Sequence, residues 1–301
     1  MVAPVAGAAT TTLTDAHGHS VEFVSSAPPQ TPEQQFADVL FGLVHGAEMD
    51  ALTVHLNVTE QEHRDACGDA AGCYSHGLNP GTLYVRAFDV NEIGDPIPYT
   101  PQEMPRGLIA HEYGHHVSAH RVNDGPLEGG GLANGTKRWA SYVGVCPGVR
   151  AGALAVDYPS WPGEGFAEAY RSLHFPENLN FWFMHPQYKP DQRALDLIRE
   201  DVVNPYSGPT RVKAKGKFKA RGKGKQRKRL ETPLDGELTA SLKTKGSLRA
   251  KLAVLVDGKR VAKGKGRKQE LTYEVCGARQ IEFEVKRKRG KGRYTVKAAR
   301  P

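Results

Sequence analysis

The sequence predicts an α+β domain over residues 10–204 and a small all-β sandwich over residues 231–301. In the first part, helix-capping signals alternate with strand-like apolar runs, whereas in the second part short apolar runs recur at regular spacing between glycine or charged turns. The charge also changes sign: residues 1–210 hold 11 basic against 25 acidic residues, a balance of −14, and residues 211–301 hold 30 against 8, a balance of +22. At 301 residues, two modest domains are expected.

The elements of the first domain follow from capping and periodicity. Thr31-Pro32-Glu33 and Thr59-Glu60-Gln61-Glu62 are each typical of a helix start, because threonine is a good N-cap and proline and glutamate suit the first turn. Alternation of apolar and polar residues predicts strands. In chain order we expect a helix from Thr31 to Leu43, a strand over Leu52–Val58, a short helix from Thr59, a strand over Thr82–Phe88, a glycine-rich loop over 122–135, a helix over Asp191–Val203 and a linker over 204–209.

A further helix is predicted from Thr100-Pro101-Gln102-Glu103, with a threonine N-cap, a proline at the first helical position and a capping-box glutamate. The segment His111-Glu112-Tyr113-Gly114-His115 falls in its second and third turns and fits the pattern H-E-x-x-H. Residues four apart share one face of a helix, so both imidazoles can bind one metal ion. Glu112 then projects beside the metal, where it can take a proton from a metal-bound water.

A catalytic zinc needs three protein ligands and one open position. In the longer pattern H-E-x-x-H-x-x-G-x-x-H the third histidine would fall at position 121, which is Arg121, so the chain does not complete that pattern. Downstream, Pro162-Gly163-Glu164-Gly165-Phe166-Ala167-Glu168 resembles the second active-site helix of the gluzincin metallopeptidases. The resemblance implies a zincin-like fold in which Glu164 is the third zinc ligand and Glu168 hydrogen-bonds a ligand histidine. Because Gly163 replaces the asparagine of that pattern, the choice between Glu164 and Glu168 as the third ligand stays open.

Other side chains near these two motifs carry weaker signals. Asp124 and Asp157 lack the flanking pattern of a third ligand, and His116 and His120 are either supporting groups or exposed. Five side chains are candidate donors to a developing oxyanion: Tyr113, Tyr142, Tyr158, Tyr170 and His174. Aromatic residues in such helices more often pack in the core than take part in catalysis. In the zincin group an edge strand upstream of the motif helix holds an extended substrate through backbone hydrogen bonds. Residues 82–88 are the candidate, although a plain core strand would have the same pattern.

The second domain is predicted from five short runs, Leu238–Leu242, Leu252–Val256, Leu271–Val275, Ile281–Val285 and Tyr294–Val296. Its closing segment, Gln280–Val285 followed by Gly292-Arg293-Tyr294-Thr295-Val296, resembles the bacterial pre-peptidase C-terminal domains. Such domains accompany secreted peptidases, so this resemblance agrees with the one around the H-E-x-x-H motif.

The second part is also strongly basic. From Arg211 to Arg227 every odd position is Lys or Arg, which fits either a basic linker over 205–230 or a first strand with one cationic face. We expect an anionic cell-wall polymer or another polyanion as partner, or docking on the acidic domain of the same chain. The sequence has no helix-turn-helix, zinc-finger spacing or RNP-like aromatics, so specific recognition of nucleic acid is not expected.

Cysteine usage and the first residues bear on the compartment. None of the four cysteines forms a C-x-x-C pair. Cys67 and Cys73 could close a local disulfide, and Cys146 and Cys276 could then join the two domains. Four cysteines allow three pairings, so the pairing stays open. Disulfides imply an oxidising compartment. Residues 1–9 resemble the remnant of a signal peptide, and no apolar run is long enough to span a membrane. We therefore expect a secreted or cell-surface protein.

Together these patterns predict a zinc metallopeptidase that hydrolyses peptide bonds. Zn²⁺ would be held by His111, His115 and Glu164, with Glu112 as the general base toward a zinc-activated water. The alternative is a non-catalytic cell-surface or polyanion-binding protein that retains the zinc site. Zinc-dependent hydrolysis of another substrate, such as a cell-wall peptide, also stays open.

Overall fold

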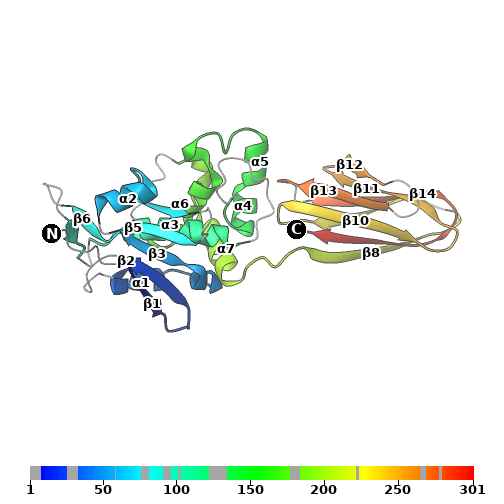
Figure 1. The fold of residues 1–301 in the computed structure, drawn as a ribbon. Helices are drawn as coiled ribbons and strands as arrows, with labels where there is room; N and C mark the ends of the chain where they lie inside the picture. Colours follow the sequence, from blue (N-terminus) through cyan, green and yellow to red (C-terminus); the bar gives the residue numbers. More distant parts are fainter. Residues whose placement is uncertain are drawn as a thin grey trace. The chain divides into compact units, whose positions relative to one another are not determined.

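The computed structural model describes residues 8–25, 33–57, 59–75, 81–90, 96–100, 103–121, 134–176, 184–221, 224–264, 269–277 and 280–301. The described residues form two compact units, shown with their elements in Figure 1. Unit 1 comprises those of 1–123, 127–143 and 151–205, and unit 2 those of 144–150 and 206–301. The coarse fold class is confirmed, since unit 1 mixes helices with strands and the sheets of unit 2 form a β-sandwich.

A five-stranded mixed sheet of order β1-β2-β3-β5-β4 forms one layer of unit 1. Its strands are β1 (Ala9–Thr14), β2 (Ser20–Ser25), β3 (Thr53–Asn57), β4 (Gly72–Ser75) and β5 (Thr82–Arg86), and β6 (Phe88–Val90) and β7 (Pro96–Pro98) form a separate ribbon. Strands β2, β3 and β5 run parallel, whereas the outer strands β1 and β4 are antiparallel to their neighbours. The expected edge strand at 82–88 is therefore wrong, because β5 is paired on both sides and β4 forms the edge.

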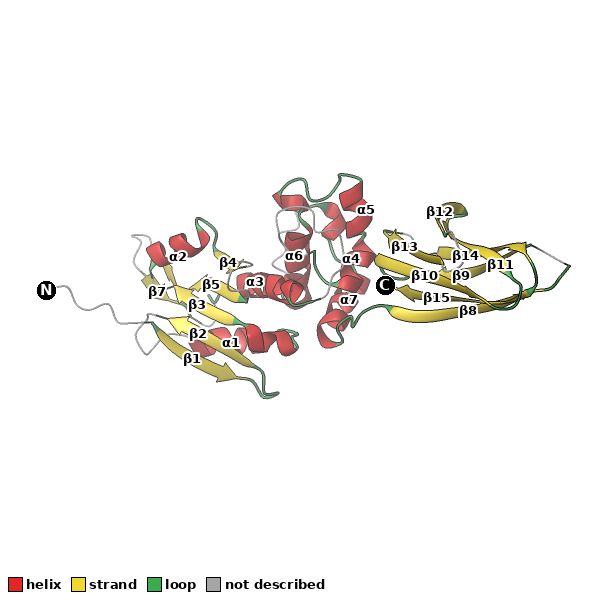
Figure 2. Ribbon diagram, turned by 45° about the vertical axis from the view of Figure 1, so that its right-hand side comes forward, coloured by secondary structure: helices red, strands yellow, loops and turns green. Residues whose placement is uncertain are grey.

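The helices of unit 1 include the two that carry the motifs (Figure 2). They are α1 (Glu33–Phe41), α2 (Glu60–Cys67), α3 (Arg106–Ala119), α4 (Lys137–Val143), α6 (Pro162–His174) and α7 (Gln192–Val203), with short 3₁₀ turns η1 (Ala47–Ala51), η2 (Tyr158–Ser160) and η3 (Pro186–Tyr188). Thr59 is the N-cap of α2, as expected, and forms a capping box with Glu62. Asp191 caps α7 by accepting from the Ala194 N–H at 2.8 Å.

The expected start of the motif helix is corrected. Thr100 and Glu103 do interact, since the Glu103 carboxylate accepts from the Thr100 N–H at 3.2 Å, but they close a separate turn. Helix α3 begins only at Arg106, with Pro105 as its N-cap. A proline disfavours helical backbone in the residue before it, so Met104 cannot join the turn to the helix. Pro101 and Gln102 lie outside the described residues, as do Thr31 and Pro32, residues 1–7 and most of the predicted loop at 122–135.

Unit 2 contains two four-stranded antiparallel sheets and a short helix, α5 (Val145–Arg150). The first, which we call the β8 sheet, has the order β13-β10-β15-β8, and the second, the β9 sheet, has the order β12-β11-β14-β9. The strands are β8 (Thr210–Phe218), β9 (Lys225–Glu231), β10 (Gly236–Thr244), β11 (Arg249–Val256), β12 (Lys259–Lys263), β13 (Gln269–Val275), β14 (Gln280–Arg289) and β15 (Gly292–Arg300). The sequence left residues 205–230 open between a linker and a first strand. In the structure they contain β8 and most of β9.

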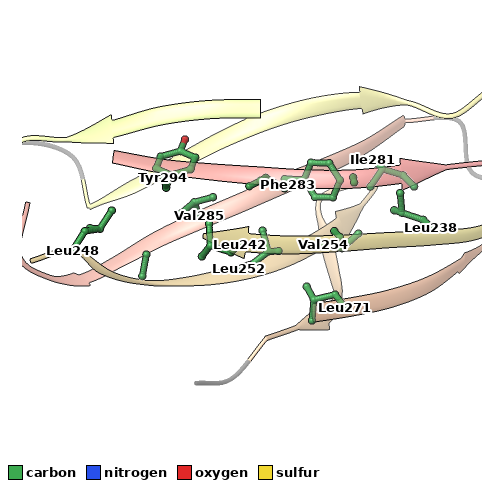
Figure 3. Packing of buried hydrophobic residues seen from close by; sticks show 14 of the residues in the cluster. Leu238, Leu242, Leu248, Leu252, Val254, Leu271, Ile281, Phe283, Val285 and Tyr294 are labelled. Carbon is green, nitrogen blue, oxygen red and sulfur yellow. The ribbon is translucent and has the colours of Figure 1, made fainter. Parts of the chain in front are cut away.

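Inward-facing side chains of both sheets form one apolar core (Figure 3). Its centre includes Leu252, Ile281 and Val285, each fully buried, and every such side chain contributes about 1.5–3 kcal/mol by leaving water. Gly216 on β8 lies directly opposite Tyr294 on β15, and a Cβ at Gly216 would fall 2.3 Å from the Tyr294 hydroxyl. The glycine in the basic run therefore makes room for the tyrosine ring, which packs over the strand as aromatic residues do at sheet glycines.

Both predicted disulfides are formed. Cys67 and Cys73 have Cα atoms 5.6 Å apart, and Cys146 and Cys276 5.4 Å apart. Cys146 lies on α5, which belongs to unit 2, so its bond to Cys276 lies within unit 2 and the expected link between two domains is corrected. Ala9, the last residue of the segment that resembles a signal peptide, begins β1 and pairs with Ser25. Within the described residues, every helix is too short or too polar to cross a membrane.

Candidate metal centre

Close packing of α3 against α6 brings the two sequence motifs together. A Cβ placed on Gly114 would lie 2.8 Å from the Cα of Ala167 and 3.2 Å from the Cβ of Tyr170, so a glycine is needed where the helices meet. On the other side of α6, a Cβ on Gly165 would lie 2.3 Å from the ring of Tyr188. Glycines inside both motifs therefore fix the position of α6, because the distance between packed helices depends on the side chains at the contact.

Three potential metal ligands converge between these helices. Nε2 of His111 lies 3.3 Å from Oε2 of Glu164, and Nε2 of His115 lies 3.5 Å from Oε1 of the same carboxylate. One donor atom from each of the three residues lies within 4.8 Å of the other two. In a tetrahedral zinc site with bonds of about 2.1 Å, neighbouring ligand atoms are roughly 3.4 Å apart. The two nitrogens and the carboxylate therefore fit a zinc ion in both chemistry and spacing.

Glu168 lies behind His111, one helical turn after Glu164. Its carboxylate is 3.2 Å from Nδ1 of His111 and forms an ion pair with Arg171. Nε2 of His111 is thereby directed toward Glu164, as a carboxylate partner orients a metal-binding imidazole. Burial lowers the pKa of His111, but hydrogen bonds with Glu164 and Glu168 outweigh it and raise that pKa to about 10. The surrounding carboxylates thus favour positive charge at this position.

The pKa values of Glu164 and Glu112 are shifted in opposite directions. Burial opposes ionisation of Glu164, but its hydrogen bonds with His111 and His115 hold its pKa below the ordinary value. Glu112 is 6% exposed, and burial raises its pKa although both imidazoles oppose the shift. An acid with a raised pKa beside the three donors can both accept and return a proton, which is what a general base and acid requires.

Tyr158 is the aromatic side chain that reaches the cluster. Its hydroxyl donates to Oε2 of Glu164 at 2.7 Å, and burial, followed by the charge of Glu164, raises the pKa of Tyr158 above its ordinary value. The hydroxyls or rings of the other candidates are bonded elsewhere. Tyr113 donates to Glu48, Tyr142 to Asp191, Tyr170 to the Val44 carbonyl, and His174 accepts from the Val44 N–H.

The remaining described candidates, His116, His120 and Asp157, are bonded to groups other than the three donors. His116 is fully buried, bonded to the Glu48 carbonyl at 2.7 Å and to the Tyr74 hydroxyl at 3.2 Å, and burial lowers its pKa to about 4. His120 is the C-cap of α3, and its Nδ1 lies 2.9 Å from the His116 carbonyl oxygen. Asp157 caps η2 through the Ser160 N–H at 3.2 Å. Asp124 lies outside the described residues.

The roles of two residues of this region, Arg171 and Arg121, were not predicted from the sequence. Arg171, which is nearly buried, neutralises Glu168 and follows Glu164 and Glu168 on the same face of α6. Its spacing of three and seven residues from those acids was the available signal. Arg121 stands where the longer pattern would have its third histidine. It pairs with the buried carboxylate of Glu48, and that carboxylate also accepts a hydrogen bond from the Tyr113 hydroxyl at 3.0 Å. That pair holds η1 against α3.

Comparisons with known proteins give no family for the chain. No protein-family model matches it, and no curated protein matches it. The solved pre-peptidase C-terminal domain of a collagenase from Bacillus anthracis is 13% identical over 29% of this chain and 87% of that one, with a TM-score of 0.25. PliG from Aeromonas hydrophila, a periplasmic inhibitor of g-type lysozyme, is 14% identical over 31% of this chain and 89% of that one, with a TM-score of 0.25. Such low TM-scores support no conclusion about function.

Proposed function

We propose that this chain is a zinc metallopeptidase of the gluzincin type. The observation that carries the proposal is the approach of Glu164 to Nε2 of both His111 and His115, at 3.3 and 3.5 Å. A pair of histidines with one glutamate is the ligand set of zinc peptidases that keep a fourth position open for water or substrate. These three side chains would hold the ion. The third-ligand role falls to Glu164 because Glu168 is engaged with Nδ1 of His111 and with Arg171.

Zinc bound there would act as a Lewis acid, which can lower the pKa of a water from about 15.7 to about 7 and polarise a peptide carbonyl. Glu112 accepts the proton of the attacking water and returns it to the leaving amine; its raised pKa suits both steps. Glu168 holds the ring of His111 in one orientation. The Tyr158 hydroxyl, which donates to Glu164, is the group best placed to donate to a developing oxyanion.

The sheet edge beside α3 suits an extended peptide. Strand β4 forms the edge, pairs with β5 on one side and contacts α3. We propose that an extended substrate lies along this edge, as peptides do at other sheet edges. This assigns to Gly72–Ser75 the role that the sequence suggested for residues 82–88.

Secretion is part of the proposal. The two disulfides, Cys67–Cys73 and Cys146–Cys276, use all four cysteines of the chain. Disulfides form and persist in oxidising compartments and are rare in reducing ones. An extracellular peptidase would act on peptides or proteins outside the cell.

The test compares the full chain with its Glu112→Gln variant. We expect one zinc per chain in both proteins by atomic absorption, and a loss of about 10²–10⁴-fold in hydrolysis of a fluorescein-labelled unfolded casein. Glu237→Gln, which removes an exposed carboxylate from β10, is the control and should keep full activity. Undiminished turnover by Glu112→Gln, or absence of zinc from the wild-type chain, would refute the mechanism. Stoichiometric zinc without any hydrolysis would instead favour the non-catalytic binding protein.

A further inference from the structure

The outward face of the β8 sheet carries a field of cations, which we call the cationic face. Its members are all exposed: Arg211, Lys213, Lys215 and Lys217 on β8, Arg293 and Lys297 on β15, and Lys243 on β10. Strand register sets Lys213 directly opposite Lys297, and Lys217 opposite Arg293. Alternate residues of a strand are about 6.7 Å apart, so the cations of β8 form a regular row roughly 20 Å long.

Protection of the sheet edge does not account for the whole face. Strand β8 is an edge strand, and lysines on such a strand discourage pairing with other sheets. That role needs cations only on the edge strand. Here Lys297 lies one strand inside the edge and Lys243 two strands inside it. Like charges directly opposite each other also destabilise a sheet, so the arrangement costs stability that a bound polyanion would offset.

The β9 sheet carries more cations than the β8 sheet, but acidic side chains of the same sheet pair with several of them. Glu284 accepts from Lys225 at 2.8 Å and lies 3.4 Å from both Arg227 and Arg260. Glu282 pairs with Arg227 at 3.1 Å. By contrast, none of the cations of the cationic face lies in an ion pair with an acidic residue of the described ranges. Among the described residues, the cations of the cationic face therefore lack the acidic partners that Glu282 and Glu284 provide on the β9 sheet.

A groove of about 790 Å³ runs over the same face. Arg211, Lys213 and Lys297 line it together with the hydroxyl-bearing residues Thr239, Ser241 and Thr272, and Glu270 is its one acid among the described lining residues. Ammonium, guanidinium and hydroxyl groups are donors suited to phosphate oxygens. Small residues from the middle strands thus form a floor beside the row of cations.

We propose that the cationic face binds a linear phosphodiester polymer without bases, of the teichoic-acid type. Charge complementarity requires an anionic chain with regularly repeated charges. Proteins that bind single-stranded nucleic acid add aromatic stacking platforms, but no aromatic residue lies on the outward face among the described positions of β8, β10, β13 and β15. Nor do the large exposed hydrophobic residues of the described chain lie on this sheet, which disfavours insertion into a membrane. This proposal is independent of the peptidase activity.

The experiment uses the full chain, labelled poly(glycerol phosphate) as the probe, and fluorescence anisotropy between 50 and 200 mM salt. The triple variant Lys213→Gln, Lys215→Gln, Lys297→Gln removes three cations from the cationic face. A matched control, Lys259→Gln, Lys263→Gln, Lys288→Gln, removes the same charge from exposed positions of the β9 sheet. Far-UV circular dichroism checks that both variants keep the wild-type fold. Single-stranded oligothymidylate and phosphatidylglycerol vesicles of equal phosphate concentration are the competing ligands.

We expect the face variant to bind the polymer at least about tenfold more weakly at 50 mM salt and its log–log salt slope to fall by about 2, because roughly three phosphate contacts are lost. The control should stay within threefold of wild type. Equal losses in the two triple variants would show generic attraction and overturn the proposal. So would undetectable binding by the wild-type chain at 50 mM salt, or tighter binding to the oligothymidylate or the vesicles than to the polymer.

Discussion

Substituting alanine for Gly114 tests the helix contact on which the candidate metal centre depends. The new Cβ would lie 2.8 Å from the Cα of Ala167, whereas unstrained carbon atoms are about 3.5–4.0 Å apart, so α6 would have to move by roughly 1 Å. Overpacking of this kind costs about 1–3 kcal/mol. The upper end applies because the contact is with the backbone of α6, which cannot rotate away. Alanine is a better helix former than glycine by about 1 kcal/mol, leaving a net loss of about 2 kcal/mol.

Urea unfolding followed by tryptophan fluorescence measures this loss. Trp139 and Trp161, two of the three tryptophans of the chain, lie in the described part of unit 1, so their emission reports on the unit that contains the contact. With a urea slope of about 2 kcal/mol/M, the midpoint should fall by about 1 M. Zinc binding should weaken as well, because ligand positions tolerate only about 0.2 Å of error.

Gly107→Ala is the matched control on the same helix. A Cβ there would lie 3.4 Å from Nη1 and 3.6 Å from Cδ of Arg171, a flexible side chain that can shift. We expect this variant to unfold at the wild-type urea concentration or slightly above it. If Gly114→Ala behaves like Gly107→Ala, α3 and α6 do not pack as closely as described, and the reasoning fails.

Three further outcomes follow from the structure. Replacing Cys146 and Cys276 by serine should cost about 5 kcal/mol and replacing Cys67 and Cys73 about 2, because the closed loops span 130 and 6 residues; equal losses in urea unfolding followed by circular dichroism would contradict this. Burial raises the pKa of Glu48, but the charge of Arg121 outweighs this effect and lowers that pKa. The ion pair therefore stabilises the folded state above pH 4.5, and this stability is lost as the pH falls through the pKa of Glu48 in the folded state. Glu48→Gln should thus be about 3 kcal/mol less stable at pH 7, with the gap to wild type narrowing below pH 4.5; a gap that is constant with pH would be inconsistent with the ion pair. If the proposed zinc site is correct, Glu168→Ala should raise the zinc Kd by about 10–100-fold in competition with a chelator, and an unchanged Kd would remove its orienting role.

Local signals in the sequence were reliable where the interacting groups are within four residues. The helix starts predicted at Thr59 and Asp191 are examples, because a side chain there meets backbone groups of its own first turn. The start of α3 was mispredicted from an equally good local signal at Thr100, since Pro105 separates that turn from the helix. Strand order could not be derived locally either: β4 follows α2 in the chain but lies outside β5 in the sheet.

The sequence by itself determined which side chains share a helix face, and that the run from Arg211 would be cationic on one side if it formed a strand. His111 with His115, Glu164 with Glu168, and Lys213 with Lys215 all follow from the fixed periods of helix and strand. Only the tertiary structure decided which faces meet. The histidine pair reaches Glu164 because Gly114 admits Ala167 at the crossing of α3 and α6. The compensation of charge on one sheet and not on the other was likewise decided there, because strand pairing joins residues far apart in the chain and no local period encodes it.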